Sequence, residues 1–348
     1  MVSQFDTLVG ALDVEDRFIQ AEAARLLGEL RRKEAVGPLL RYVGRFGWQT
    51  KLVGFHALAQ IGDRGVCPAL RPLVDKPNCF NDWYWYGCRG VRAAAAIALL
   101  ALGDDAGAAC LRELADAGHD VFYAWFAPAI LRLGDEPPAT SEIKARITLE
   151  AIWPPDKPLV RRTDGGVVTM VAETLGLLGT ERAFSELVGL MRFRSRYVRG
   201  QAALSLLSAA PTKKHLAAVE KIARSDKTDF ARIKAHEALA RCSTGVSPVL
   251  PEKTRKASVD AIAALAAKAA DPFDQAVAVE SLGSLACAEH SPLIRQKLSH
   301  ADPYVRRCAI EALERIEPAA GGEAAAASLD DPDPFVRLQA AKSFVACE

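Results

Sequence analysis

A small residue followed four positions later by a large one recurs ten times along the 348-residue chain. Successive occurrences are 31, 41, 32, 44, 31, 33, 43, 31 and 31 residues apart, so the base period is 31 residues with three insertions. The small positions are Ala23, Gly54, Ala95, Ala127, Val171, Ala202, Ala235, Ala278, Ala309 and Ala340. The large positions are Leu27, Leu58, Leu99, Leu131, Leu175, Leu206, Leu239, Leu282, Leu313 and Phe344. A period of this length is typical of solenoids, in which one supersecondary unit stacks on the next.

Each repeat is expected to contain two helices. In the ninth repeat, Arg306, Ala309, Ile310 and Leu313 fall at i, i+3, i+4 and i+7, which is one face of an α-helix. A second, shorter apolar segment follows in most repeats, and alternating β-branched residues typical of strands are scarce. We therefore predict an all-α solenoid of about ten two-helix repeats that forms a single domain over residues 1–348. The first helices are expected near residues 17–30, 49–61, 89–102, 121–133, 167–178, 197–209, 230–242, 273–286, 304–316 and 335–346.

The apolar segments of the chain favour a protein without membrane contact. The longest uncharged apolar stretch, residues 93–103, is too short to span a bilayer. Residues 1–12 lack the basic-then-apolar layout of a signal peptide, so we expect a cytoplasmic protein. Its eight cysteines include no CxxC pair, which favours buried free thiols. Those in or beside apolar helical stripes are Cys67, Cys110, Cys242, Cys308 and Cys347.

Two late repeats begin with the same motif. Residues 302–306 read Asp-Pro-Tyr-Val-Arg, and residues 333–337 read Asp-Pro-Phe-Val-Arg. The Asp is expected to cap the helix, the Pro to occupy its first turn, and the Arg to bridge to an acidic group of the adjacent layer. The motif resembles HEAT repeats, in particular the bacterial type named after phycobilisome lyases, and the resemblance extends over nearly the whole chain. The HEAT-repeat consensus describes a fold and not an activity, so the resemblance implies the fold only. Function is therefore sought where the chain departs from the repeat.

Aromatic residues concentrate in the first two insertions and in the repeat between them. The insertions span residues 75–89 and 152–166, and all five tryptophans lie between Trp48 and Trp153. Two interpretations stay open: the aromatic side chains cover apolar repeat surface as a lid, or they bind a partner or ligand. The candidate binding residues are Asp82, Trp83, Tyr84, Trp85, Tyr86, Arg89, Tyr123, Trp125, Trp153, Arg161 and Arg162.

A second candidate site lies in a basic stretch. The formal net charge is +1, but residues 191–241 contain twelve Lys or Arg against four Asp or Glu. We predict an anion-binding site for an acidic protein or peptide partner, against the alternative that these arginines pair with neighbouring layers. The near-zero net charge and the acidic segment 301–348 disfavour duplex nucleic acid as the partner. The candidate anion-binding residues are Arg192, Arg194, Arg196 and Arg199.

The sequence shows no signature of catalysis. It contains no Gly-rich phosphate loop, no nucleophile elbow and no zinc-ligand spacing, so we expect no catalytic residue, metal or cofactor and favour a non-enzymatic interaction scaffold. The resemblance leaves two alternatives: a bilin lyase-like or chaperone-like protein, and a HEAT-like alkylpurine DNA glycosylase or nucleic-acid binder. The chain also resembles deoxyhypusine hydroxylases in one pair, His236 and Glu237, whereas that family needs several such pairs to hold two irons. The last repeat ends on its first helix, and this open end is a candidate surface for oligomerisation.

Overall fold

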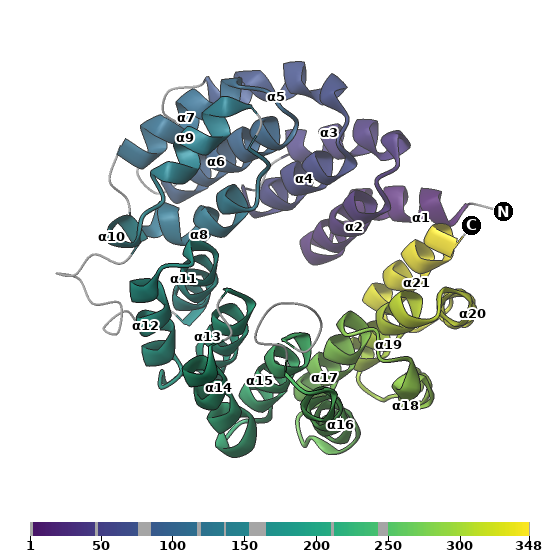
Figure 1. Cartoon of the computed structure of the whole chain (residues 1–348). Coiled ribbons are helices and arrows are strands. Elements are labelled where there is room, and N and C mark those ends of the chain that lie inside the picture. The colour runs from purple at the N-terminus through teal and green to yellow at the C-terminus, as the bar shows by residue number, and fades with distance from the viewer. Residues whose placement is uncertain are drawn as a thin grey trace. The chain divides into compact units, whose positions relative to one another are not determined.

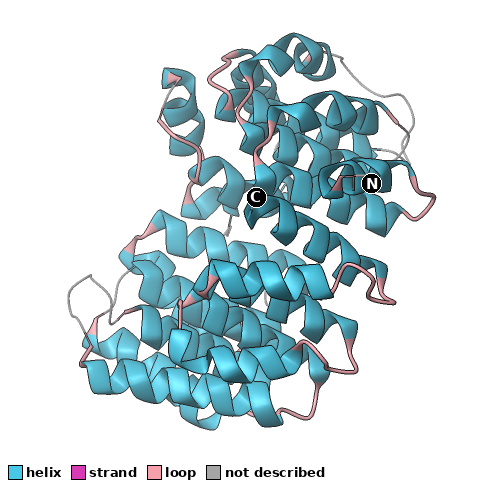
Figure 2. Ribbon diagram, turned by 90° about the vertical axis from the view of Figure 1, so that its right-hand side faces the viewer, coloured by secondary structure: helices cyan, strands magenta, loops and turns pink. Residues whose placement is uncertain are grey.

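The computed structural model describes residues 3–45, 48–75, 85–116, 120–135, 137–152, 165–209, 212–242 and 250–347. In these ranges all regular structure is helical, as Figure 2 shows. The predicted all-α fold of stacked two-helix repeats is confirmed. Residues 1–152 form one compact unit and residues 153–343 form a second, while the last residues divide between the two. That the whole chain forms a single domain stays a prediction.

The first unit alternates long first helices with shorter second helices (Figure 1). Its first helices are α2 (Arg17–Leu30), α4 (Trp48–Ile61), α6 (Trp85–Ala101) and α8 (Asp120–Leu131). Its second helices are α3 (Val36–Gly44), α5 (Cys67–Val74), α7 (Ala106–Asp116) and α9 (Pro138–Ala145), with α1 (Gln4–Gly10) before and α10 (Leu149–Ile152) after them. A Cβ on Gly28 of α2 would lie only 2.7 Å from the Cα of Ala57 of α4. Adjacent first helices therefore approach so closely that a small residue is required where they meet.

The second unit repeats the same arrangement. Its first helices are α11 (Gly165–Leu178), α13 (Arg196–Ala209), α15 (Asp229–Arg241), α17 (Pro272–Ser284), α19 (Pro303–Ile316) and α21 (Pro334–Cys347). Its second helices are α12 (Glu181–Leu190), α14 (Lys213–Ser225), α16 (Glu252–Lys268), α18 (Ser291–Lys297) and α20 (Pro318–Ala327). Packing is closest between neighbours such as α13 and α15 or α17 and α19.

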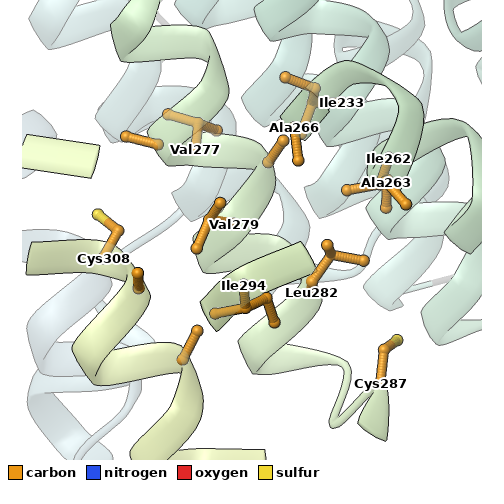
Figure 3. Close-up of a cluster of buried hydrophobic side chains, with 14 of the residues drawn as sticks. Ile233, Ile262, Ala263, Ala266, Val277, Val279, Leu282, Cys287, Ile294 and Cys308 are labelled. Carbon is orange, nitrogen blue, oxygen red and sulfur yellow. The ribbon is translucent and has the colours of Figure 1, made fainter. Parts of the chain in front are cut away.

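The periodic small and large residues form the core. In the second unit Ala202, Ala278, Leu206 and Leu282 have no exposed surface. Figure 3 shows how α17 contributes to a buried cluster in which residues of α15, α16, α18 and α19 also take part. Each fully buried Leu contributes about 1.5–3 kcal/mol relative to an exposed one, so the repeat pattern accounts for much of the driving force for stacking. The predicted free, buried thiols are confirmed for Cys67, Cys110, Cys242 and Cys308.

The helix-start motif behaves as predicted. Asp302 Oδ1 accepts a hydrogen bond from the backbone N–H of Tyr304 at 2.8 Å, and Asp333 Oδ1 accepts one from Phe335 at 2.9 Å. Pro occupies the first position of both α19 and α21. The Asp satisfies a backbone donor that the helix itself leaves unpaired, which fixes where each helix begins. In the described ranges no helix combines the length and the apolarity that crossing a bilayer requires.

Candidate anion-binding site

Arginines of several first helices bridge to acidic residues of the same or the next layer. Each bridge has two nitrogen–oxygen contacts of 2.7–3.0 Å. The pairs are Arg92 with Glu113, Arg199 with Asp226, and Arg306 with Asp331. Asp226 and Asp331 precede the first helix of the following repeat, so these two bridges join adjacent layers, as the helix-start motif predicted.

Arg199 also determines the shape of the turn before α13. Its Nη1 donates to the carbonyl oxygens of Phe193 and Arg194, both at 2.9 Å. The side chains of Arg199 and Asp226 are each 6% exposed. Burial alone would raise the pKa of Asp226, but hydrogen bonds from Arg199 and Thr228 outweigh it and hold that pKa below its usual value. Arg199 therefore directs its donors to the protein and positions the turn.

Arg196 also contacts acceptors within the chain. Its guanidinium donates to Asp271 at 3.2 Å and to Asp274 at 3.3 Å, both at the start of α17, and to the Tyr197 hydroxyl at 3.2 Å. Arg196 is the first residue of α13, so this contact passes α15 and reaches the second repeat along the chain. Of the four predicted anion-binding arginines, Arg196 and Arg199 thus bind carboxylates of the protein itself.

Arg192 and Arg194 are exposed and line a pocket of about 430 Å³ between the turn after α12 and helix α14. The exposed side chains of Lys221 and Lys227 line the same pocket. We call this the basic pocket. Its lining consists of Val188, Met191, Arg192, Phe193, Arg194, Arg199, Ala218, Lys221, Ile222, Ser225, Asp226 and Lys227. Five basic residues and one acidic residue contribute to that lining, and the acidic residue, Asp226, is bound to Arg199.

The basic pocket has the chemistry of an anion site. The planar guanidinium of arginine pairs with a carboxylate through two hydrogen bonds, and lysine adds a positive charge on a flexible side chain. Several cations around one concave surface raise the local concentration of an anionic group. Beside these charges, Val188, Met191 and Ile222 give part of the wall an apolar surface.

The second unit contains the recognised repeat family. Residues 259–344 match the family model for HEAT repeats. The chain therefore contains HEAT repeats within these residues.

Similar solved structures span most of the chain at low identity. An engineered protein is 18% identical over 99% of both chains, with a TM-score of 0.33. Human deoxyhypusine hydroxylase in complex with glycerol is 16% identical over 90% of this chain and 96% of its own, with a TM-score of 0.33. The complex of CpcE and CpcF of phycocyanin lyase from Nostoc sp. PCC7120 is 18% identical over 90% and 93%, with a TM-score of 0.34. No curated protein matches the chain.

The register of the two-helix repeats identifies one pocket residue that the sequence prediction missed. Lys227 stands five residues before Arg232, and Arg194 stands five residues before Arg199, so the two occupy equivalent positions in neighbouring repeats. An alignment of the repeats would therefore have placed Lys227 beside Arg194. Lys221 belongs to the second helix α14, and only the packing of α14 against the turn brings it to the pocket.

The predicted aromatic site stays a prediction. Trp85, Tyr86 and Arg89 belong to α6, and Tyr123 and Trp125 to α8, but their side chains are not among those described. The remaining candidates lie outside the described residues: Asp82, Trp83, Tyr84, Trp153, Arg161 and Arg162.

The described ranges contain no group of three or more His, Cys, Asp or Glu placed to hold a metal ion. Glu237, from the single His-Glu pair, instead accepts hydrogen bonds from Lys234 at 2.9 Å, from Arg241 at 2.7 Å and from Ser281 at 2.8 Å. Ser281 belongs to α17, so the Glu237 carboxylate links α15 to the next first helix. Its contacts are those of a structural ion pair.

Proposed function

We propose that this HEAT-repeat protein is a binding scaffold that captures an acidic segment of another protein at the basic pocket. The observation that carries the proposal is the excess of basic over acidic residues around one concave surface of the second unit. Complementary charge steers a partner to such a surface and orients it there. Stacked helices supply a rigid support for this purpose, because each turn is held by the layers on both sides.

The chemistry of the wall favours a peptide over a small inorganic anion. Phosphate would use the arginines and lysines but leave the partly exposed side chains of Val188 and Ile222 in water. A segment with carboxylates flanking an apolar side chain would contact both kinds of surface. Duplex nucleic acid needs a longer basic track, and the positions equivalent to Arg194 in the eighth and ninth repeats are Ala270 and Ala301.

The test uses a short fluorescein-labelled peptide of Glu residues with interspersed Leu, followed by fluorescence anisotropy. The double variant Arg192→Ala/Arg194→Ala should bind it at least about tenfold more weakly, since each lost charge-assisted hydrogen bond costs roughly 1.5–3 kcal/mol. The matched control is Arg224→Ala/Lys268→Ala, which removes the same charge at exposed positions outside the pocket lining. Equal weakening by both double variants would show that net charge, and not the pocket, governs binding.

Two competitors separate the alternatives. Excess inorganic phosphate should displace the peptide poorly, and a peptide with Lys in place of Glu should not bind. If duplex DNA binds tightly at physiological ionic strength and the Arg192→Ala/Arg194→Ala variant loses that binding, the proposal gives way to the nucleic-acid alternative.

A further inference from the structure

Aromatic rings from four consecutive repeats contact one another at the starts of the first helices in the second unit. Ring centroids of Tyr197 and Phe230 lie 4.8 Å apart, those of Phe230 and Phe273 6.1 Å, and those of Phe273 and Tyr304 5.6 Å. These residues belong to α13, α15, α17 and α19 and each is the second residue of its helix. We call this row the aromatic ladder.

The guanidinium of Arg196 lies among the first three rings of the ladder. It is 5.1 Å from the ring centroid of Tyr197, 5.9 Å from that of Phe230 and 5.6 Å from that of Phe273. Asp271 and Asp274 contact the same group at 3.2 and 3.3 Å. Three ring faces within about 6 Å of a cation, together with carboxylates, are the arrangement by which proteins recognise guanidinium and alkylammonium groups.

We refer to Tyr197, Phe230, Phe273, Asp271 and Asp274 as the cage. The cage holds more negative than positive charge, because two carboxylates face one guanidinium. The Asp274 side chain is only 5% exposed. Burial raises the pKa of Asp274, Arg196 opposes that rise, and the nearby carboxylates of Asp271 and Asp229 add to it. A cation at this position therefore stabilises the buried carboxylate of Asp274.

Arg196 is held less closely than Arg199. Its contacts with carboxylates are 3.2 and 3.3 Å long, whereas those of Arg199 are 2.7 and 2.8 Å. Its side chain is 26% exposed, against 6% for Arg199. Short charge-assisted hydrogen bonds of about 2.7–2.9 Å are the strong ones.

The repeat itself does not need an arginine at this place. The equivalent first positions of α17, α19 and α21 are prolines: Pro272, Pro303 and Pro334. The stacking of repeats is thus compatible with a residue that has no guanidinium at this place, and the layer contacts of Arg199 are made to a different carboxylate, Asp226.

We propose that the cage is a cation-binding site which Arg196 fills in the free protein and which an arginine side chain of a partner protein takes over. The site is distinct from the basic pocket in its residues and in the sign of its ligand, so either proposal can fail without the other. An arginine of the partner competes with Arg196 for the cage. The partner arginine can bind only when Arg196 is out of the cage, so its apparent affinity is the intrinsic affinity multiplied by the fraction of protein in which the cage is open.

The first experiment removes the guanidinium of Arg196 by mutation and supplies a guanidinium ion from solution. Arg196→Ala is heated in millimolar N-ethylguanidinium chloride and in sodium chloride of equal ionic strength. The variant should melt lower than the wild type and regain part of the difference in ethylguanidinium only. Arg192→Ala, which removes an exposed arginine of the same turn, should show no such gain. The absence of an ethylguanidinium-specific gain in Arg196→Ala overturns the proposal.

The second experiment measures exchange directly by isothermal titration calorimetry. An acetyl-Gly-Arg-Gly amide peptide should bind Arg196→Ala at least about tenfold more tightly than the wild type, because the internal competitor is gone. The neutral citrulline analogue should bind neither, and Arg196→Ala/Phe273→Leu should lose the gain. Equal affinity of the peptide for wild type and Arg196→Ala, or equal binding of the citrulline analogue, contradicts the cage. If Arg196→Ala does not fold, Arg196→Gln provides the same comparison while keeping a long polar side chain.

Discussion

Replacing Arg199 by Ala tests the bridges between layers most severely. The change leaves Asp226 charged at 6% side-chain exposure without its bidentate partner, and it removes the donor to two carbonyl oxygens of the preceding turn. Breaking a buried ion pair by removing one partner costs about 3–5 kcal/mol, whereas an exposed pair is worth only about 0.2–1 kcal/mol. We therefore expect Arg199→Ala to lower the free energy of unfolding of the second unit by about 3–5 kcal/mol at neutral pH.

The loss should depend on pH with a defined sign. In the wild type the pKa of Asp226 is lowered from 3.8, so its stabilising contribution is present above that value and is lost as the pH falls through the folded-state pKa. In Arg199→Ala the hydrogen bonds and charge of the arginine no longer oppose burial and only those of Thr228 remain, so the pKa of Asp226 should rise. Protonation then relieves the buried charge, and the difference between wild type and variant should shrink as the pH falls from neutral toward about 4.

Urea unfolding followed by circular dichroism at neutral and acidic pH measures both effects. The double-mutant cycle with Asp226→Asn isolates the pair, and its coupling energy should exceed about 1 kcal/mol, as expected for residues in one hydrogen-bonded network. Arg224→Ala, whose side chain is 74% exposed, serves as the control and should change stability by less than about 0.5 kcal/mol. A loss below about 1 kcal/mol for Arg199→Ala, or one that does not vary with pH, would refute a buried structural bridge.

Three further predictions concern other parts of the chain. Gly283→Ala should destabilise the protein by about 1–3 kcal/mol because the new Cβ would lie 2.8 Å from the Cα of Ala312. Gly189→Ala is the control: no atom lies within 4 Å of its Cβ position, so this change should be neutral or stabilising. Equal melting temperatures of the two variants would contradict the close approach of α17 and α19. Burial raises the pKa of Cys308 to about 12, so a thiol reagent should modify it only when the protein unfolds, and rapid labelling of native protein at that residue, located by mass spectrometry, argues against its place in the core. Replacing Trp83, Trp85 and Trp153 by Ala should weaken partner capture while leaving the helical circular dichroism nearly unchanged if the insertions bind a partner; a parallel loss of helicity would favour the lid instead.

Much of the core could be predicted from the sequence because a solenoid repeats one packing problem. Ala202, Ala278 and Ala309 recur at one position of the repeat, and all three are fully buried. The arginine bridge was predictable for the same reason, since Arg199 and Arg306 share a position and each faces an aspartate before the next layer. The aromatic ladder follows the same register and could have been found by aligning the repeats.

The candidate sites were less predictable because they depend on contacts that the period does not specify. Arg192 and Arg196 look alike in sequence, yet one is exposed at a pocket and the other reaches Asp271 and Asp274 two repeats away. A nearest-neighbour description of a repeat protein does not contain such a contact. Lys221 joins the basic pocket only through the packing of α14. The insertions break the period, so repeat reasoning places none of their side chains.

The salt dependence of acidic-peptide binding is the most direct test of the proposed scaffold function. Labelled Glu-Leu peptide is titrated with wild type and with Arg192→Ala/Arg194→Ala as the ionic strength rises from 0.01 to 0.15 M, over which the Debye length falls from about 30 to about 8 Å. We predict that wild-type affinity falls steeply with salt and that the double variant binds more weakly with a flatter dependence. Wild-type binding that is insensitive to salt, or a variant with the same slope as the wild type, would contradict capture of an acidic segment by the basic pocket.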